Sequence, residues 1–379
     1  MKPAIVVVAY NRPLALKRLL ISLDQAEYLM EDITLIISID KAVNESDVLE
    51  VANKFNWRFG KKIIRTFEER QGLRKHVLSC GDLSDEYGAV IILEDDLYVS
   101  KNFFSYTVSA LDYYHECDSI TGIALYSHEW NGYAHRFFMP VADGFDTYLG
   151  QFSITWGQCW TKKWWGRFRK WYEEHKDSLG ENENIPAAIN TWSSQSWGRY
   201  FVNYIVENDL YYVIPRYALS TNCSEIGQHA TFQDTDHQVR LLMSNTTEYR
   251  FAEIGKCTRY DIFFENMDLK MDRFVSDRVT IDLNGIDREN NIATRYLLST
   301  KILPFKVEKS FGISFRPIDM NVIQNIAGEG IYLYDCSQRS KCPRNNLLDI
   351  TRYELRGMSN KQLVSYIIAL IKRKLLRRK

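Results

Sequence analysis

Three consecutive carboxylates, Glu94, Asp95 and Asp96, follow directly on an apolar run at residues 89–93. The run is short and rich in β-branched side chains, which predicts a strand buried on both faces that ends at the acids. Carboxylates this close repel one another, so the cluster needs a cation or hydrogen-bond donors beside it. Mg²⁺ and Mn²⁺ prefer such oxygen ligands and commonly complete their shells with substrate phosphates. The triplet therefore indicates a metal and phosphate site or, as the plain alternative, an acidic turn that lies in water or caps a helix.

The residues before the triplet alternate between short apolar runs and amphipathic stretches. Strands are predicted at 4–10, 33–39 and 62–66, and helices at 14–23, 46–55 and 72–83. Such alternation predicts a largely parallel sheet with crossover helices, whose ligand site lies off the carboxyl ends of the strands. Arg12, Asp40 and the acid triplet all come at the ends of predicted strands. We therefore expect these side chains to meet at one edge of the sheet.

This region contains neither GxGxxG nor GxxxxGK[ST], which excludes the usual dinucleotide fingerprint and the P-loop. It does contain four segments over residues 3–115, in the order VVVAYNRPLALKRLLISL, IISID, QGLRKHVLSCGDL and VIILEDDLYVSKNFFSY. In order and spacing they resemble the nucleotide-sugar half of GT-A fold glycosyltransferases, most closely the N-acetylglucosaminyltransferase I type and bacterial polysaccharide glycosyltransferases. The resemblance implies an α/β fold with a Rossmann-like, mostly parallel sheet. It also implies inverting, metal-dependent transfer of a hexosyl or N-acetylhexosaminyl group from a nucleotide-sugar, with UDP as the expected nucleotide.

The resemblance assigns roles to the acids of the triplet. Asp96 matches the last acid of the family motif, which holds Mn²⁺ against the diphosphate, so Mn²⁺ or Mg²⁺ is the expected cofactor. Asp95 and Glu94 would lie nearer the ribose and the sugar. His229, in a GxH pattern, matches a late histidine that reaches the metal or the diphosphate in many of these enzymes. The alternative for His229 is a histidine that stabilises its loop.

The resemblance also assigns nucleotide contacts to three residues of the first strands and the helix after them. Arg12 would contact the nucleotide, Asp40 the uracil or ribose, and His76 the nucleotide. Each has a structural alternative that stays open. Arg12 could cap a helix, Asp40 could be a turn residue, and His76 could be a helix histidine with its hydrogen bonds satisfied.

An aromatic stretch, ITWGQCWTKKWWGRFRKWYEE, begins at residue 154. The spacing of four residues between Trp156, Trp160 and Trp164 predicts one face of a helix, which is the ordinary pattern of a buried stripe. Aromatic faces also pack against sugar rings, so contact with the acceptor is the second interpretation. The segment is similar to the family's SWGWATWKDRW motif, which lies beside the donor and acceptor sites.

The catalytic base is the point at which the sequence departs from the family. Its members often place an aspartate just before an SW pair or within a WDxxW run, and this chain has Ser194 and Gln195 instead. Neither side chain is a useful base at neutral pH. The weak candidates that remain are Glu225, Asp143 and Asp146. Loss of activity is the alternative.

The tail of the chain carries fewer signals. We predict a GT-A domain at 1–250, divided into a nucleotide half at 1–115 and an acceptor half at 116–250, followed by an α+β region at 251–358. Residues 359–379 read as a basic amphipathic helix. It would either contact an anionic inner membrane, where polyprenyl-linked acceptors are found, or dock on its own domain.

Composition limits the compartment and the partners. The 379 residues include 48 basic and 48 acidic side chains, so no net charge favours nucleic acid. Seven cysteines without a CxxC pair favour a reducing compartment, and the amino terminus has no signal-peptide pattern. We expect a cytoplasmic transferase of surface polysaccharide synthesis, peripheral on the inner face of the membrane, with a glycan or lipid-linked acceptor. The alternatives are a nucleotidyltransferase, which usually has a Gly- and Lys-rich amino-terminal loop that is absent here, and a catalytically silent sugar-binding protein.

Overall fold

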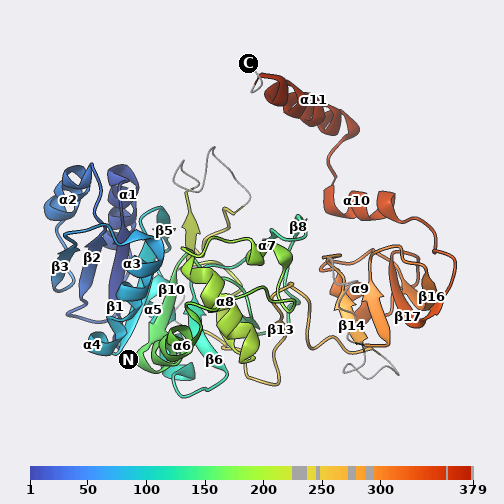
Figure 1. Ribbon diagram of the computed structural model, residues 1–379, viewed down its shortest axis with the longest axis horizontal. Coiled ribbons are helices and arrows are strands. Elements are labelled where there is room, and N and C mark those ends of the chain that lie inside the picture. Colours follow the sequence, from blue (N-terminus) through green and yellow to red (C-terminus); the bar gives the residue numbers. More distant parts are fainter. Residues whose placement is uncertain (224–236, 245–247, 272–278, 287–293, 356, 377–379) are drawn as a thin grey trace. The chain divides into compact units, whose positions relative to one another are not determined.

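The computed structural model describes residues 1–223, 237–244, 248–271, 279–286, 294–355 and 357–376. The chain folds into two compact units, Met1–Asp268 and Leu269–Lys379 (Figure 1). The first unit is built on a mixed, mostly parallel sheet with helices on both faces, and the second has a small sheet of its own. The predicted α/β fold with an appended α+β region is confirmed.

Nine strands form the main sheet in the order β13-β9-β11-β6-β10-β4-β1-β2-β3. Five of the eight neighbouring pairs are parallel, and β10 is antiparallel to both of its neighbours, β4 and β6. The strands are β1 (Ala4–Ala9), β2 (Leu35–Ile39), β3 (Lys62–Thr66), β4 (Ala89–Glu94), β6 (Ile120–Ala124), β9 (Thr147–Gly150), β10 (Gln158–Thr161), β11 (Tyr211–Pro215) and β13 (Arg259–Tyr260). Because β13 pairs with β9, the structure includes residues beyond 250 in the first unit.

The central strands are apolar on both faces because helices cover both. Ile5 and Val7 of β1 pack with α1, α2 and α5, whereas Val6 and Val8 pack with α3, α6 and α8 (Figure 1). This pattern explains the continuous β-branched runs, since a strand with two buried faces does not alternate with polar residues. The helices of this unit are α1 (Pro13–Asp24), α2 (Glu45–Lys54), α3 (Gly72–Gly81), α4 (Ser84–Tyr87), α5 (Phe103–Tyr114), α6 (Lys162–His175), α7 (Ala187–Asn190) and α8 (Trp197–Glu207).

The tryptophan-rich stretch does not form the single helical face that its spacing predicts. Trp156 precedes β10, Trp160 lies within β10, and Trp164 lies in α6, which begins at Lys162. Gly157 has φ +99°, a left-handed conformation that a continuous helix does not contain. The prediction of a buried stripe is correct for two of the three, because Trp160 and Trp164 are fully buried while Trp156 is only partly buried.

Two further pairs of short strands belong to the first unit. β5 (Leu97–Val99) follows the acid triplet and pairs antiparallel with β12 (Ser220–Asn222), and β7 (Trp130–Asn131) pairs with β8 (Arg136–Phe137). Just beyond β12, the backbone N–H of Cys223 donates to the carbonyl of Asp96 at 2.9 Å. The chain before the undescribed segment 224–236 is therefore anchored beside the acids.

The second unit contains a four-stranded sheet in the order β14-β15-β17-β16. Its strands are β14 (Val279–Asp282), β15 (Tyr296–Ser299), β16 (Phe305–Phe311) and β17 (Ile331–Arg339), and its helices are α9 (Asp319–Ile323), α10 (Leu347–Leu355) and α11 (Asn360–Leu376). Leu298, Leu333 and Phe311 centre one cluster of its core. No helix in the described part of the chain is long and apolar enough to cross a membrane.

Candidate active site

The ends of β1, β2 and β4 bring the predicted strand-end residues to one edge of the sheet. Val8 is in register with Glu94, and Ala9 is in register with Ile39. The backbone N–H of Asp95 donates to the carbonyl of Val8 at 3.1 Å, and that of Asp40 donates to the carbonyl of Ala9 at 2.9 Å. Asp40 and Asp95 therefore flank the end of β1 on opposite sides.

Arg12 lies among the acids and pairs with two of them. Its Nη1 is 3.0 Å from Asp96 Oδ2, and its Nη2 forms an ion pair with Asp95 Oδ1. Asp95 is buried and also accepts a hydrogen bond from the backbone N–H of Tyr10 at 3.4 Å. The cation that the triplet requires is thus supplied, at least in part, by the chain itself. Arg12 also immediately precedes α1, but its side chain makes no capping hydrogen bond.

Burial raises the pKa values of two acids of the triplet, Glu94 and Asp95. It raises the pKa of Glu94 to about 8, and the charges of Asp96 and Asp95 add to that shift. Burial also raises the pKa of Asp95 to about 6, although the positive charge of Arg12 opposes the change. Three carboxylates share one described cation, so the site has room for further positive charge.

Asp96 is the acid whose environment best fits a metal ligand. Its Oδ2 pairs with Arg12, whereas its Oδ1 is buried and has no hydrogen-bond partner among the described residues. A buried carboxylate oxygen without a partner is unfavourable unless an ion, a water molecule or a ligand occupies that position. Mg²⁺-type sites often use one or two carboxylates and take their other ligands from water and phosphate. The described residues contain no group of three or more His, Cys, Asp or Glu side chains placed for a metal. A metal ion bound here would therefore have one or two carboxylate ligands from the described residues.

Asp40 is held by backbone donors of its own turn and of α3. Its Oδ1 accepts from the N–H of Lys41 at 2.9 Å and of Gln71 at 2.7 Å, and its Oδ2 accepts from the N–H of Gly72 at 2.9 Å. Two of these N–H groups belong to the start of α3, where helix donors lack partners within the helix. In this structure Asp40 therefore connects the end of β2 to the beginning of α3. Its predicted contact with the nucleotide stays a prediction.

His76 is a buried residue between α3 and the sheet. Its Nε2 lies 2.8 Å from the hydroxyl of Ser38 in β2, and its ring packs edge-on against Phe67. Burial lowers the pKa of His76 to about 4, so the ring is neutral at physiological pH. These contacts are those of a core histidine, and its predicted role at the nucleotide also stays a prediction.

Two of the three base candidates lie at this same edge of the sheet but far from the triplet. Asp143 and Asp146 precede β9, which is four strands from β4 in the sheet order, or about 19 Å at the usual strand spacing. Burial alone would raise the pKa of Asp143, but hydrogen bonds from the Thr258 N–H and the charge of Arg216 lower it below its ordinary value. Asp146 accepts from the N–H of Arg250 at 2.7 Å. The lowered pKa of Asp143 makes it a weak base.

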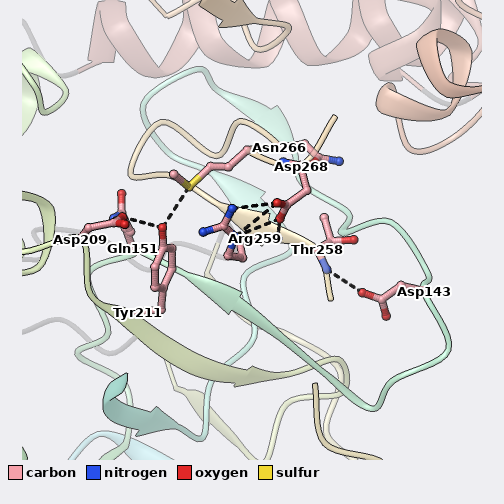
Figure 2. A network of polar contacts seen from close by, with 9 residues as sticks. Asp143, Gln151, Asp209, Tyr211, Thr258, Arg259, Asn266 and Asp268 are labelled. Atoms are coloured by element: carbon pink, nitrogen blue, oxygen red, sulfur yellow. Dashed lines mark hydrogen bonds and ion pairs between the residues drawn. The ribbon is translucent and has the colours of Figure 1, made fainter. Parts of the chain in front are cut away.

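Figure 2 shows the polar network to which Asp143 belongs. Asp143 reaches the backbone of Thr258, and the next residue, Arg259, pairs with Asp268 at 2.8 Å. In the same view the hydroxyl of Tyr211 donates to Asp209 at 2.6 Å. The hydrogen bond from Thr258 joins the segment before β9 to the beginning of β13, so the described surroundings of Asp143 are structural. The third base candidate, Glu225, and the possible metal ligand His229 lie outside the described residues.

One residue of this edge, Gln158, was not singled out by the sequence. Gln158 precedes Cys159 in β10 and pairs with Ile92, so its buried side chain lies on the α3 face of the sheet, as does Glu94 two residues beyond Ile92. Its Oε1 has no described partner. Antiparallel pairing also carries the chain before β10 to the end of β4, which places Trp156 at the edge that holds the acids. Gln158 is unusual only because it is a polar residue in a buried strand. The sequence does not reveal this burial unless the pairing of β10 is known.

Trp156 is partly covered by a histidine from a distant part of the chain. The ring centroids of Trp156 and His237 are 5.0 Å apart at an interplanar angle of 32°, and Tyr126 packs on the same tryptophan at 4.7 Å. The hydroxyl of Tyr126 donates to the carbonyl of His237 at 2.9 Å. Of the tryptophans in the aromatic stretch, Trp156 is thus the one whose ring is both partly exposed and near the acids.

No protein-family model and no curated protein sequence matches this chain. Solved structures align with it at low similarity. Staphylococcus aureus TarS 1–349 in complex with UDP-GlcNAc aligns at a TM-score of 0.39 with 14% identity, and covers 60% of this chain and 60% of its own. The mannosyltransferase PcManGT from Pyrobaculum calidifontis, in complex with GDP-Man and Mn²⁺, aligns at 0.31 with 10% identity, over 44% of this chain and 47% of its own. The chain thus spans about 60% of the length of TarS 1–349. Similarity of this degree assigns no donor, metal or acceptor to the chain.

Proposed function

We propose that this chain is a metal-dependent glycosyltransferase that moves a sugar from a UDP-sugar to a hydroxyl group of a glycan or a lipid-linked acceptor. The observation that carries the proposal is the meeting of Arg12, Asp95 and Asp96 at the carboxyl edge of β1 and β4. This is the edge at which open parallel sheets bind their ligands. The order and spacing of the sequence segments around these residues support the same reaction.

The residues of this edge have separate roles in the proposal. Asp96 would hold a divalent ion through its unpaired Oδ1, with Asp95 behind it. Once bound, the ion would neutralise the charge that develops on the departing diphosphate. Arg12 binds phosphate oxygens as readily as carboxylates, because its planar guanidinium presents paired donors. Asp40 would support the nucleotide side of the site by holding the beginning of α3.

The transfer itself is a single displacement with inversion. An acceptor hydroxyl attacks the anomeric carbon, the bond between that carbon and the diphosphate oxygen breaks, and a base takes the hydroxyl proton. Asp143 already accepts hydrogen bonds within the β13 network, and Asp146 accepts one from Arg250. Glu225 is the remaining candidate for the base. We place the reaction at the cytoplasmic face of the membrane, where polyprenyl-linked acceptors are found.

The test measures UDP release from a panel of UDP-sugars. With Mn²⁺ we expect one donor to be turned over, and we expect EDTA or the substitution Asp96→Ala to abolish the release. Asp118→Ala is the matched control, because the Asp118 side chain is 84% exposed and pairs only with Lys163 among the described residues. Thermal unfolding of both variants shows whether they are folded. Release that persists equally in Asp96→Ala and in EDTA would overturn the proposal.

The same assay separates the rival functions. Ser194 and Gln195, which replace the acid expected from the family pattern, are both exposed, and this observation favours a silent sugar-binding protein as the second candidate. Such a protein would show saturable binding of one UDP-sugar in a thermal-shift screen without release of UDP. A nucleotidyltransferase would instead release pyrophosphate from a nucleoside triphosphate.

A further inference from the structure

Helix α11 exposes an unusually large apolar surface. Six of its large apolar side chains are between 43% and 59% exposed, namely Val364, Tyr366, Ile367, Ile368, Leu370 and Ile371. Contiguous apolar surface of this kind marks a site that binds another molecule or a membrane. The exposed face of α11 is therefore a candidate binding surface.

The apolar residues of α11 occupy one wide face. At 100° per residue they span an arc of roughly 200°, from Tyr366 through Ile367 and Ile371 to Ile368. Lys361, Ser365 and Lys372 lie on the opposite side. A coiled-coil seam is narrower, because it uses only the first and fourth positions of each heptad. The width of this face is typical of a helix that lies in the interface plane of a membrane.

The charge of this segment has one sign. Residues 360–379 contain seven Lys or Arg residues and no Asp or Glu. Since the whole chain has 48 of each kind, the first 359 residues hold 41 basic and 48 acidic side chains. The helix is thus the basic end of an otherwise acidic protein, and its charge favours an anionic surface. Helix pairs that associate through charged flanks normally combine acidic and basic residues, which this segment cannot do alone.

We infer that α11 binds the surface of an anionic phospholipid membrane, with its apolar face in the acyl boundary and its lysines among the headgroups. The inference does not rest on the proposed transferase activity, because it uses only the second unit. Its consequence for that activity is that an acceptor embedded in the same membrane is met at a surface and not in solution.

The experiment uses the full chain and vesicles of phosphatidylcholine, with or without phosphatidylglycerol, separated by sedimentation. We expect binding only to the phosphatidylglycerol vesicles, and weaker binding as salt is raised. The double variant Ile367→Ser with Ile371→Ser should weaken binding at least ~10-fold, since it removes apolar groups that the membrane would bury. Lys361→Gln should weaken binding by roughly fivefold, the contribution of one basic residue near such a surface.

A matched control comes from α10, where Leu347 and Leu348 are 67% and 61% exposed. Replacing both with serine should leave vesicle binding unchanged, because α10 also carries Asp349 and Glu354. Equal binding to neutral vesicles, or undiminished binding of the Ile367 and Ile371 double variant, would overturn the inference. So would sedimentation showing a dimer that the double variant converts to monomer while vesicles bind neither form. UDP release in detergent-free solution tests the transferase separately, so the two ideas can fail independently.

Discussion

Glu94 provides a test of the electrostatics of the strand edge. Its folded pKa of about 8 lies well above the ordinary value of 4.5, because the half-buried side chain is partly removed from water and lies beside two other acids. Between these two values the folded chain binds more protons than the unfolded chain. Stability therefore falls as pH rises through this window. The difference corresponds to an upper limit of about 5 kcal/mol in unfolding free energy.

The perturbation is Glu94→Gln, which has nearly the same shape and no charge. Without metal or nucleotide, we expect the variant to be more stable than the unmodified chain by ~2–5 kcal/mol at pH 8.5. At pH 5.5 the carboxyl is protonated in the folded chain but mostly ionised in the unfolded chain, so we expect the variant to be more stable by only ~1.4 kcal/mol. Urea unfolding in EDTA at both pH values gives the four free energies that are required.

The control for this comparison is Glu31→Gln, since Glu31 is exposed on the surface of the same unit. Its effect should be small and the same at both pH values. If Glu94→Gln changes stability equally at pH 5.5 and pH 8.5, the carboxyl does not titrate in this window. The account of burial and like charge at the triplet would then be wrong.

Three further predictions concern this edge and strand β10 beside it. Arg12→Ala leaves Asp95 buried without its cation and should lower the unfolding free energy by ~2–4 kcal/mol, whereas Arg12→Lys should lower it by less; chemical denaturation measures both. Asp40→Ala removes the acceptor of three backbone N–H groups and should lower the unfolding free energy by about 2 kcal/mol. Unchanged stability would show that the beginning of α3 does not depend on Asp40. Trp160→Ala should lower the unfolding free energy by ~3–5 kcal/mol because Trp160 is fully buried, whereas Trp156→Ala should change it by less than ~2 kcal/mol. In the proposed transferase, Trp156→Ala should also raise the acceptor KM. Equal losses of stability in the two variants would contradict the difference in burial.

The fold of the first hundred residues is predictable because local signals agree there. Apolar β-branched runs end at Tyr10, Asp40 and the acid triplet, and the intervening stretches have helical spacing, so each predicted element appears within a few residues of its predicted bounds. The convergence of Arg12 with the acids follows from the rule that parallel strands share a carboxyl edge. No knowledge of side-chain packing was needed for that step.

The remaining features depend on contacts between distant segments. Nothing near Asp40 in the sequence indicates that its carboxylate accepts hydrogen bonds from Gln71 and Gly72, about thirty residues later. The burial of His76 likewise depends on how α3 packs on β2. The helical spacing of Trp156 and Trp160 was misleading because Trp160 pairs in β10, between two strands that are remote in sequence. Sequence periodicity cannot reveal such a pairing.

The position of β10 has a mechanical consequence. This strand is hydrogen-bonded to β4, which carries the acids, and to β6, the first strand of the predicted acceptor half, so the two predicted halves share one continuous sheet. A hinge between them would have to break ladder hydrogen bonds in the middle of the sheet, where every neighbouring side chain is packed. In the proposed transferase, the distance between groups held at the ends of β4 and β6 would therefore be set when the chain folds.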